Sequence, residues 1–152
     1  MSKDGPFIVS ACLAGVNCRM EGGNKLVPEI KRLVDEGKSI PVCPEELGGL
    51  PTPRDPSEQR NGRVFSKSGK DVTAEFIRGA EESLRIGREH GCTCAILKAK
   101  SPSCGVGLIH NGRFDGGLME GNGVFTQMLL DAGIPVMMEQ EFLAAILSIT
   151  EL

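Results

Sequence analysis

Three cysteines in this chain each lie just after a short apolar run. Cys12 follows the run at 7–11, Cys43 follows the run at 39–42, and Cys104 lies a few residues beyond the run at 95–97. If these runs are parallel strands of one sheet, their carboxyl ends point the same way, and the three thiols converge on one crevice. Three converging thiols indicate a metal centre, and a set of only three leaves a coordination position open.

Segments with helical spacing of apolar residues alternate with these runs. The spacing over 26–36 predicts a helix that ends at Gly37, a residue suited to the left-handed conformation of a helix end. The same reasoning gives further helices over 73–90, 121–132 and 140–149, and a fourth strand over 134–138. Strands that alternate with helices form a parallel sheet covered on both faces. We therefore predict a single-domain, three-layer α/β/α (Rossmann-like) fold over residues 1–152, with a mainly parallel sheet of about four strands and small hairpin insertions.

Turn residues interrupt this pattern in three places. Prolines and glycines over 44–62 predict that most of this segment is irregular. The segment 63–72 predicts a small hairpin turned at Ser68-Gly69, after which Thr73 caps a helix. Asn111-Gly112 between apolar flanks predicts a second hairpin over 108–115.

Composition limits the partners of the chain. A net charge of −3, from 17 basic and 20 acidic residues without a Lys or Arg run, gives no footprint for a nucleic-acid polymer or an anionic membrane. The first apolar run is too short for a signal-peptide core or a membrane span, so we expect a cytoplasmic protein. We expect a small-molecule partner and a monomer or weak homodimer. In a reducing cytosol the six cysteines are ligands, catalytic groups or core residues rather than disulfides.

Two of the cysteine loops carry additional chemistry. Cys43 precedes Pro44, which favours an extended backbone, and Glu45 places a carboxylate two positions away. In the run Ser101-Pro102-Ser103-Cys104-Gly105, a tight loop places backbone amides where they can face the sulfur. The structural alternatives are a buried thiol, a solvated loop acid and a turn that contains a cysteine.

The remaining thiols and the histidines are weaker candidates. Cys18 lies six residues after Cys12 and is the main competitor for a fourth ligand position, whereas Cys92 and Cys94 are interpreted as packing residues. His90 and His110 are interpreted as surface residues. Thiolate-rich sites select zinc or an iron–sulfur cluster, and structural zinc favours four ligands at short spacing. Three dispersed cysteines suit a four-iron cluster with one iron open.

Several motifs together resemble a family of small bacterial proteins long classed as a domain of unknown function, which includes the thiouracil desulfidases. The resemblance rests on motifs that span nearly the whole chain: Cys12-Leu13-x-Gly15 with Arg19, Cys43-Pro44-Glu45, Gly48-Gly49-Leu50 through Pro53-Arg54-x-Pro56-x-Glu58, Gly69-x-Asp71-Val72-Thr73, Leu97-Lys98-x-x-Ser101-Pro102-Ser103-Cys104-Gly105, Gly112-x-Phe114 and Gly121-x-Gly123-Val124.

This resemblance implies a [4Fe-4S] cluster held by Cys12, Cys43 and Cys104, with Glu45 and Ser101 as the polar catalytic residues. It implies a non-redox desulfidase that removes sulfur hydrolytically from thiolated nucleobases or related thiocarbonyl compounds. An open iron is exposed to oxidation, so we expect aerobic preparations to lose the cluster or to replace it with zinc.

Two further interpretations accompany the motif match. Arg54 and Glu58 are interpreted as a structural ion pair, and Gly121-Asn122-Gly123 as a plain helix entry rather than an anion site.

Two other functions stay open on the sequence alone. One is a non-catalytic sensor or carrier that binds zinc or a cluster through three or four thiols. The other is a cofactor-free α/β domain whose thiols are redox sensors or core residues. The role of Cys18 distinguishes the sensor or carrier from an enzyme, because a fourth thiolate ligand would occupy the open position on the iron.

Overall fold

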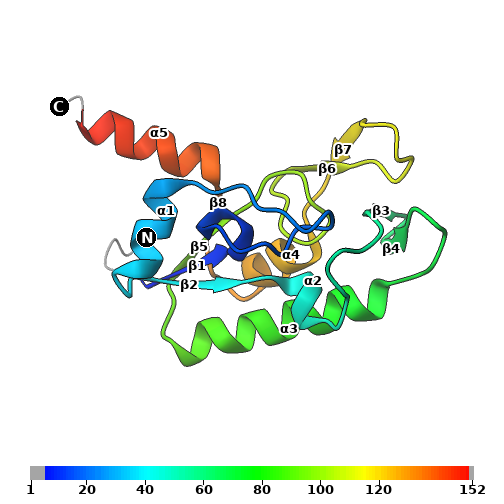
Figure 1. Cartoon of the computed structure of the whole chain (residues 1–152), viewed down its shortest axis with the longest axis horizontal. Coiled ribbons are helices and arrows are strands. Elements are labelled where there is room, and N and C mark those ends of the chain that lie inside the picture. The colour runs from blue at the N-terminus through cyan, green and yellow to red at the C-terminus, as the bar shows by residue number, and fades with distance from the viewer. Residues whose placement is uncertain (1–5, 151–152) are drawn as a thin grey trace.

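A sheet of four short parallel strands forms the centre of the molecule, in the order β2-β1-β5-β8 (Figure 1). The structure, a computed structural model, describes residues 6–150, and its side chains as far as residue 146. The strands are β1 (Phe7–Ser10), β2 (Ser39–Val42), β5 (Cys94–Leu97) and β8 (Val136–Met138), and every neighbouring pair is parallel. The predicted α/β fold with a parallel sheet of four strands is confirmed.

Helices cover both faces of this sheet, as Figure 1 shows. Ile8 and Val9 are fully buried and point to opposite faces because side chains alternate along a strand. Ile8 belongs to a core with residues of α3 (Thr73–Glu89) and α4 (Val124–Asp131), whereas Val9 packs with residues of α1 (Pro28–Asp35) and α5 (Glu139–Thr150). The result is the predicted three-layer arrangement, with the carboxyl ends of the strands left free for loops.

Two glycines bring the short helix α2 (Pro44–Leu47) against α3. A Cβ atom on Gly79 would overlap the carbonyl oxygen of Pro44, and one on Gly48 would overlap the carbonyl oxygen of Glu75. Only glycine allows the two backbones to approach this closely. The contact fixes the position of the segment that follows β2.

The proline-rich segment 44–62 contains more regular structure than the sequence indicates. It holds α2 and the strand β3 (Ser57–Arg60), which pairs with β4 (Arg63–Ser66). The turn of this hairpin is Asn61-Gly62, where both residues have positive φ (52° and 76°), as a type I′ turn requires. The predicted turn at Ser68-Gly69 is present as a second, smaller reversal, and an isolated bridge joins Phe65 to Asp71 across it.

The predicted end of α1 is confirmed, whereas the first residues of α3 and α4 differ from the predictions. Gly37 follows the end of α1 with φ of 75°, as predicted. Thr73 is the first residue of α3 rather than its cap, because its hydroxyl accepts the N–H of Val64 while Asp71 accepts the N–H of Thr73. Helix α4 starts at Val124 rather than residue 121.

The hairpin predicted over 108–115 is wider than expected. Its strands are β6 (Leu108–His110) and β7 (Leu118–Glu120), with a loop over 111–117 between them. Asn111-Gly112 does not close a tight turn because the Glu58 carboxylate accepts the N–H groups of Gly112 and Phe114 and holds the loop open. Across the described residues, no helix combines the length and the apolar character needed to cross a membrane.

Candidate active site

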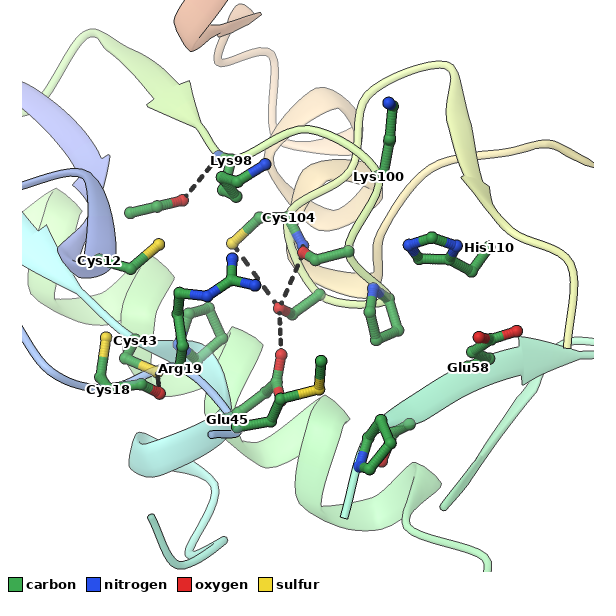
Figure 2. A pocket seen from close by; sticks show the side chains of 18 of the residues that line it. Cys12, Cys18, Arg19, Cys43, Glu45, Glu58, Lys98, Lys100, Cys104 and His110 are labelled. Carbon is green, nitrogen blue, oxygen red and sulfur yellow. Dashed lines mark hydrogen bonds between the residues drawn. The ribbon is translucent and has the colours of Figure 1, made fainter. Parts of the chain in front are cut away.

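A cavity of about 390 Å³ opens at the carboxyl ends of β1, β2 and β5. The thiols of Cys12, Cys43 and Cys104 all line it, each from a different loop (Figure 2). Ser10 and Val42, the last residues of β1 and β2, form part of the same wall. The parallel sheet therefore brings together thiols that lie far apart in the sequence.

Cys12 belongs to a 3-10 turn, η1 (Ala11–Ala14), that directly follows β1. All four residues of this turn are buried. Burial raises the pKa of the Cys12 thiol to about 11, although the positive charges of Arg19 and Lys98 oppose this shift. Both cations line the cavity beside Cys12, so they favour a negatively charged sulfur there.

Cys43 is the residue that precedes α2, and its backbone is extended (φ −122°, ψ 101°) as expected before Pro44. The Cys18 thiol beside it lowers the pKa of Cys43, and the backbone N–H of Glu46 adds to this effect. A thiol at the start of a helix is commonly acidified in this way. Cys43 is therefore the cysteine in this cavity whose environment favours the thiolate.

Cys18 lies directly beside Cys43 and lines the same cavity. Its carbonyl oxygen lies 3.8 Å from Cys43 Sγ and accepts a 2.9 Å hydrogen bond from Arg54 Nη2. The hydrogen bond between the two thiols raises the pKa of Cys18. This environment favours the protonated form of Cys18 beside Cys43.

Cys104 lies in a tight loop that rests on the first turn of α4. Ser101 Oγ accepts the Cys104 N–H at 2.8 Å, and Thr126 Oγ1 donates to the Cys104 carbonyl at 2.8 Å. Burial raises the pKa of the Cys104 thiol to about 12. The carbonyls of Pro102 and Ser103 accept the first N–H groups of α4. This confirms the interpretation of residues 121–123 as a plain helix entry.

Glu45 lies in the cavity between the cysteine loops (Figure 2). Arg54 Nε donates to its Oε1 at 3.0 Å, and the two side chains are only 7% and 15% exposed respectively. The predicted ion pair between Arg54 and Glu58 is wrong: Arg54 pairs with Glu45, and Glu58 is occupied by the backbone of the 111–117 loop. The charges of the residues alone could not select between the two acids.

Of the two serines in the Cys104 loop, Ser103 is the one that contacts Glu45. Ser103 Oγ donates to Glu45 Oε2 at 2.9 Å and lies 3.7 Å from Cys104 Sγ. Ser101 also lines the cavity, but its hydroxyl accepts the Cys104 N–H and lies 3.4 Å from Ser103 Oγ. Ser103 is not among the site residues predicted from the sequence, although it directly precedes Cys104 in a loop fixed by proline and glycine.

His110 also lies in a different environment from the one predicted. It is partly buried and lines the cavity, whereas the prediction placed it on the surface. His90 is exposed, as predicted, and its Nδ1 lies 2.9 Å from the carbonyl of Ile86. Cys92 and Cys94 are buried and do not line the cavity, in agreement with a packing role.

The donor set fits an iron–sulfur cluster better than a single ion. Across the side chains described, those of residues 6–146, no three His, Cys, Asp or Glu side chains come together closely enough to bind one metal ion. A zinc ion requires all its sulfur ligands at about 2.3 Å from one point. A four-iron cluster instead takes each thiolate at a different iron. Three thiols spread around one cavity match this second arrangement.

Comparisons with known proteins agree with this site. A family model described as 2-thiouracil desulfurase matches residues 7–141. The uncharacterized protein YbbK of Bacillus subtilis is 40% identical over 145 residues, which cover 89% of this chain and 96% of that protein. A solved structure, the [4Fe-4S]-dependent thiouracil desulfidase TudS (DUF523Vcz), matches with a TM-score of 0.86 and 44% identity over 96% of this chain and 98% of that chain. The family match includes every cavity residue described above.

Proposed function

The chain belongs to the 2-thiouracil desulfurase family, and we propose that this enzyme removes sulfur hydrolytically from thiouracil or a related thiocarbonyl compound. In the balanced reaction, water replaces the thiocarbonyl sulfur with oxygen and releases the sulfur as hydrogen sulfide. No electron is transferred, so no redox partner is needed. A non-catalytic metal-binding domain is not favoured, because the family is one of desulfurases.

The cofactor proposed for this reaction is a [4Fe-4S] cluster held by Cys12, Cys43 and Cys104. The observation that carries the proposal is the convergence of these three thiols, from three separate strand ends, on one cavity. When bound, such a cluster supplies an open iron that attracts the soft thiocarbonyl sulfur and acts as a Lewis acid. The three loops also exclude much of the solvent, since the Cys12 and Cys104 side chains are almost fully buried.

Glu45 is proposed to handle the protons of the reaction. Arg54 holds its Oε1 and Ser103 holds its Oε2, so the carboxylate is oriented before the substrate binds. A fixed carboxylate within reach of the reacting carbon can take a proton from the attacking water or give one to a ring nitrogen.

Ser101 and Ser103 are proposed to divide two tasks. Ser103 orients Glu45 through its 2.9 Å hydrogen bond. Ser101, which lines the cavity, uses its hydroxyl to orient the substrate while its oxygen holds the Cys104 N–H.

A cytoplasmic location and a monomer or weak homodimer complete the proposal. All six cysteines are free thiols in the structure, which supports a reducing compartment. The small cavity supports a free heterocycle rather than a polymer as the substrate.

The experiment that tests this function measures cofactor binding and catalysis separately. Protein purified and reconstituted without oxygen is assayed for iron and acid-labile sulfide, and then for sulfide release from 2-thiouracil and 4-thiouracil. We expect about four irons per chain and steady sulfide release. The Cys104→Ser variant should lose both iron and activity, and Glu45→Gln should keep iron and lose activity. A colourless, zinc-loaded protein after anaerobic reconstitution would contradict the proposal, as would unchanged activity in both variants.

A further inference from the structure

Cys18 and Cys43 are two thiols in contact with each other at one end of the cavity (Figure 2). A hydrogen bond joins the two thiols, and Cys43 Sγ lies 3.8 Å from the carbonyl oxygen of Cys18. The sulfur of Cys43 therefore reaches the backbone of Cys18 as well as its side chain. Among the described cysteines, no other two thiols are joined by a hydrogen bond.

The two thiols differ in their access to solvent. Cys43 is partly exposed and lines the cavity, so a small molecule in the cavity can reach its sulfur. Cys18 is only 3% exposed, so a reagent that enters the cavity meets Cys43 first. An accessible thiol beside a second thiol is the usual arrangement of a reversible redox pair, in which the second thiol traps the oxidised form of the first.

The loop of Cys18 allows the short movement that a bond between the two sulfurs needs. A disulfide requires the sulfurs to approach to about 2.05 Å, which is closer than hydrogen-bonding contact. Residues 15–27 contain neither helix nor strand, and Val16 and Asn17 beside Cys18 are exposed. Cys43 is held at the start of α2, so Cys18 is the member of the pair that moves.

The other two thiols proposed as cluster ligands are held in place by their own loops. Cys12 belongs to the buried turn η1, and its carbonyl accepts two backbone N–H groups from the segment that follows. The N–H and the carbonyl of Cys104 are each bonded to a side-chain hydroxyl at 2.8 Å. These contacts oppose the movement of Cys12 or Cys104 towards Cys43, and they leave Cys18 as its available partner.

We propose that Cys18 and Cys43 form a reversible disulfide when the cluster-free enzyme meets a peroxide, so that Cys18 protects a proposed cluster ligand from irreversible oxidation. Hydrogen peroxide oxidises the Cys43 thiol to a sulfenic acid and releases one water. The Cys18 thiol then attacks this sulfur, the S–O bond breaks, and a second water leaves as the disulfide forms. In total the two thiols give two hydrogens and two electrons to the peroxide, and a cellular dithiol reverses the change by supplying both.

The disulfide and the cluster exclude each other, because both use the sulfur of Cys43. Without Cys18, peroxide carries Cys43 past the sulfenic acid to a sulfinic acid, which dithiols do not reduce. This protective role goes beyond the desulfidase reaction, and only its link to cluster loading rests on the proposed function.

Peroxide treatment of the full chain tests the pair by mass spectrometry. Cluster-free, reduced wild type is treated with hydrogen peroxide, its remaining thiols are alkylated, and it is digested without reduction. We expect the chain to lose two of its six free thiols, with Cys18 joined to Cys43. No Lys or Arg lies between Cys12 and Cys18, so one tryptic peptide carries both, and fragmentation between them identifies the bonded cysteine.

A variant without Cys18 measures what the disulfide protects. After peroxide and then dithiothreitol, the wild type should regain the iron content of the untreated protein on anaerobic reconstitution. Cys18→Ala should instead gain two oxygens on Cys43 and lose most of this iron. Cys92→Ala is the matched control, because it also lacks one buried thiol but Cys92 does not line the cavity, and it should behave as the wild type. The disulfide map of the wild type stands even if Cys18→Ala fails to fold.

The loaded enzyme and the desulfidase assay separate the outcomes. In cluster-loaded protein the disulfide should appear only as iron is released. The proposal is overturned if Cys43 of the treated wild type stays free, pairs with Cys12 or Cys104, or carries two oxygens, or if Cys18→Ala regains all its iron. Each of these results is independent of sulfide release by the untreated, loaded enzyme. A loaded enzyme that releases no sulfide would refute the desulfidase function and leave the disulfide standing.

Discussion

Ser103 Oγ donates a 2.9 Å hydrogen bond to Glu45 Oε2, although the two residues are 58 positions apart in the chain. This bond joins the loop after β2 to the loop after β5, so it links the segments that carry Cys43 and Cys104. Glu45, the carboxylate that we propose as the proton-transfer group, thus belongs to the segment that carries Cys43 and is held in place by the loop that carries Cys104.

Loss of the Ser103 hydroxyl should impair catalysis without loss of the cluster. We expect Ser103→Ala to lower kcat by about 10–100-fold, because a carboxylate that is no longer oriented transfers protons less efficiently. Iron content and KM should stay close to wild-type values, since the substitution removes no ligand. Iron assay and steady-state sulfide release test this, with Ser66→Ala on β4 as a control, because the Ser66 hydroxyl bonds Ser68 and the N–H of Lys70 rather than Glu45. A loss of iron equal to that in Cys104→Ser would instead assign Ser103 a structural role.

The contact between α2 and α3 should be sensitive to a single methyl group. A Cβ atom on Gly79 would overlap the carbonyl oxygen of Pro44, and backbone on both sides has little room to shift. We expect Gly79→Ala to lower the free energy of unfolding by about 1–3 kcal/mol or more, as measured by urea denaturation. Gly23→Ala is the matched control, because a Cβ there would meet only the Glu21 side chain at ordinary contact distance, 3.5 Å. Equal stability of the two variants would contradict the close approach.

The framework of this site follows from local sequence patterns, but its side-chain pairings do not. Apolar runs such as Cys94–Leu97 predict strands whose carboxyl ends meet, and that rule brings the cysteines together without any knowledge of the loops. The partners of Arg54, Ser103 and Glu58 depend on how separate loops pack against one another, which no local pattern encodes. That His110 lines the cavity is likewise visible only once β6 is placed beside it.

Asp71 should make the stability of the enzyme depend on pH in acid. Its carboxylate accepts the Thr73 N–H at 2.9 Å and pairs with Arg63 at 2.7 Å. These interactions, first with Thr73 and then with Arg63, lower the pKa of Asp71 to about 2. A depressed pKa contributes stability that is fully present above the unfolded-state value near 4 and is lost as pH falls towards 2.

We therefore expect Asp71→Asn to lower the melting temperature by a few degrees at pH 7. The difference from the wild type should narrow between pH 4 and pH 3, because the Asp71 carboxyl of the unfolded wild type takes up a proton there while that of the folded protein stays ionised. Thermal denaturation of both proteins over this pH range measures the difference in melting temperature. A difference in melting temperature between the two proteins that stays constant with pH would show that the charge of Asp71 does not contribute to stability.

Cys43 should be the first thiol to react in the cluster-free protein. Its pKa is lowered by the Cys18 thiol, whereas burial raises those of Cys12 and Cys104 to about 11 and about 12. Because the thiolate is the reactive form, iodoacetamide at neutral pH should label Cys43 before the other cysteines, as peptide mass spectrometry can show. In Cys18→Ala the pKa of Cys43 should rise, so the pH profile of its labelling should move to higher pH, while reconstituted protein keeps the iron content of the wild type. If Cys18→Ala instead loses iron as Cys104→Ser does, then Cys18 is a ligand, and the open iron that the desulfidase reaction needs would be closed.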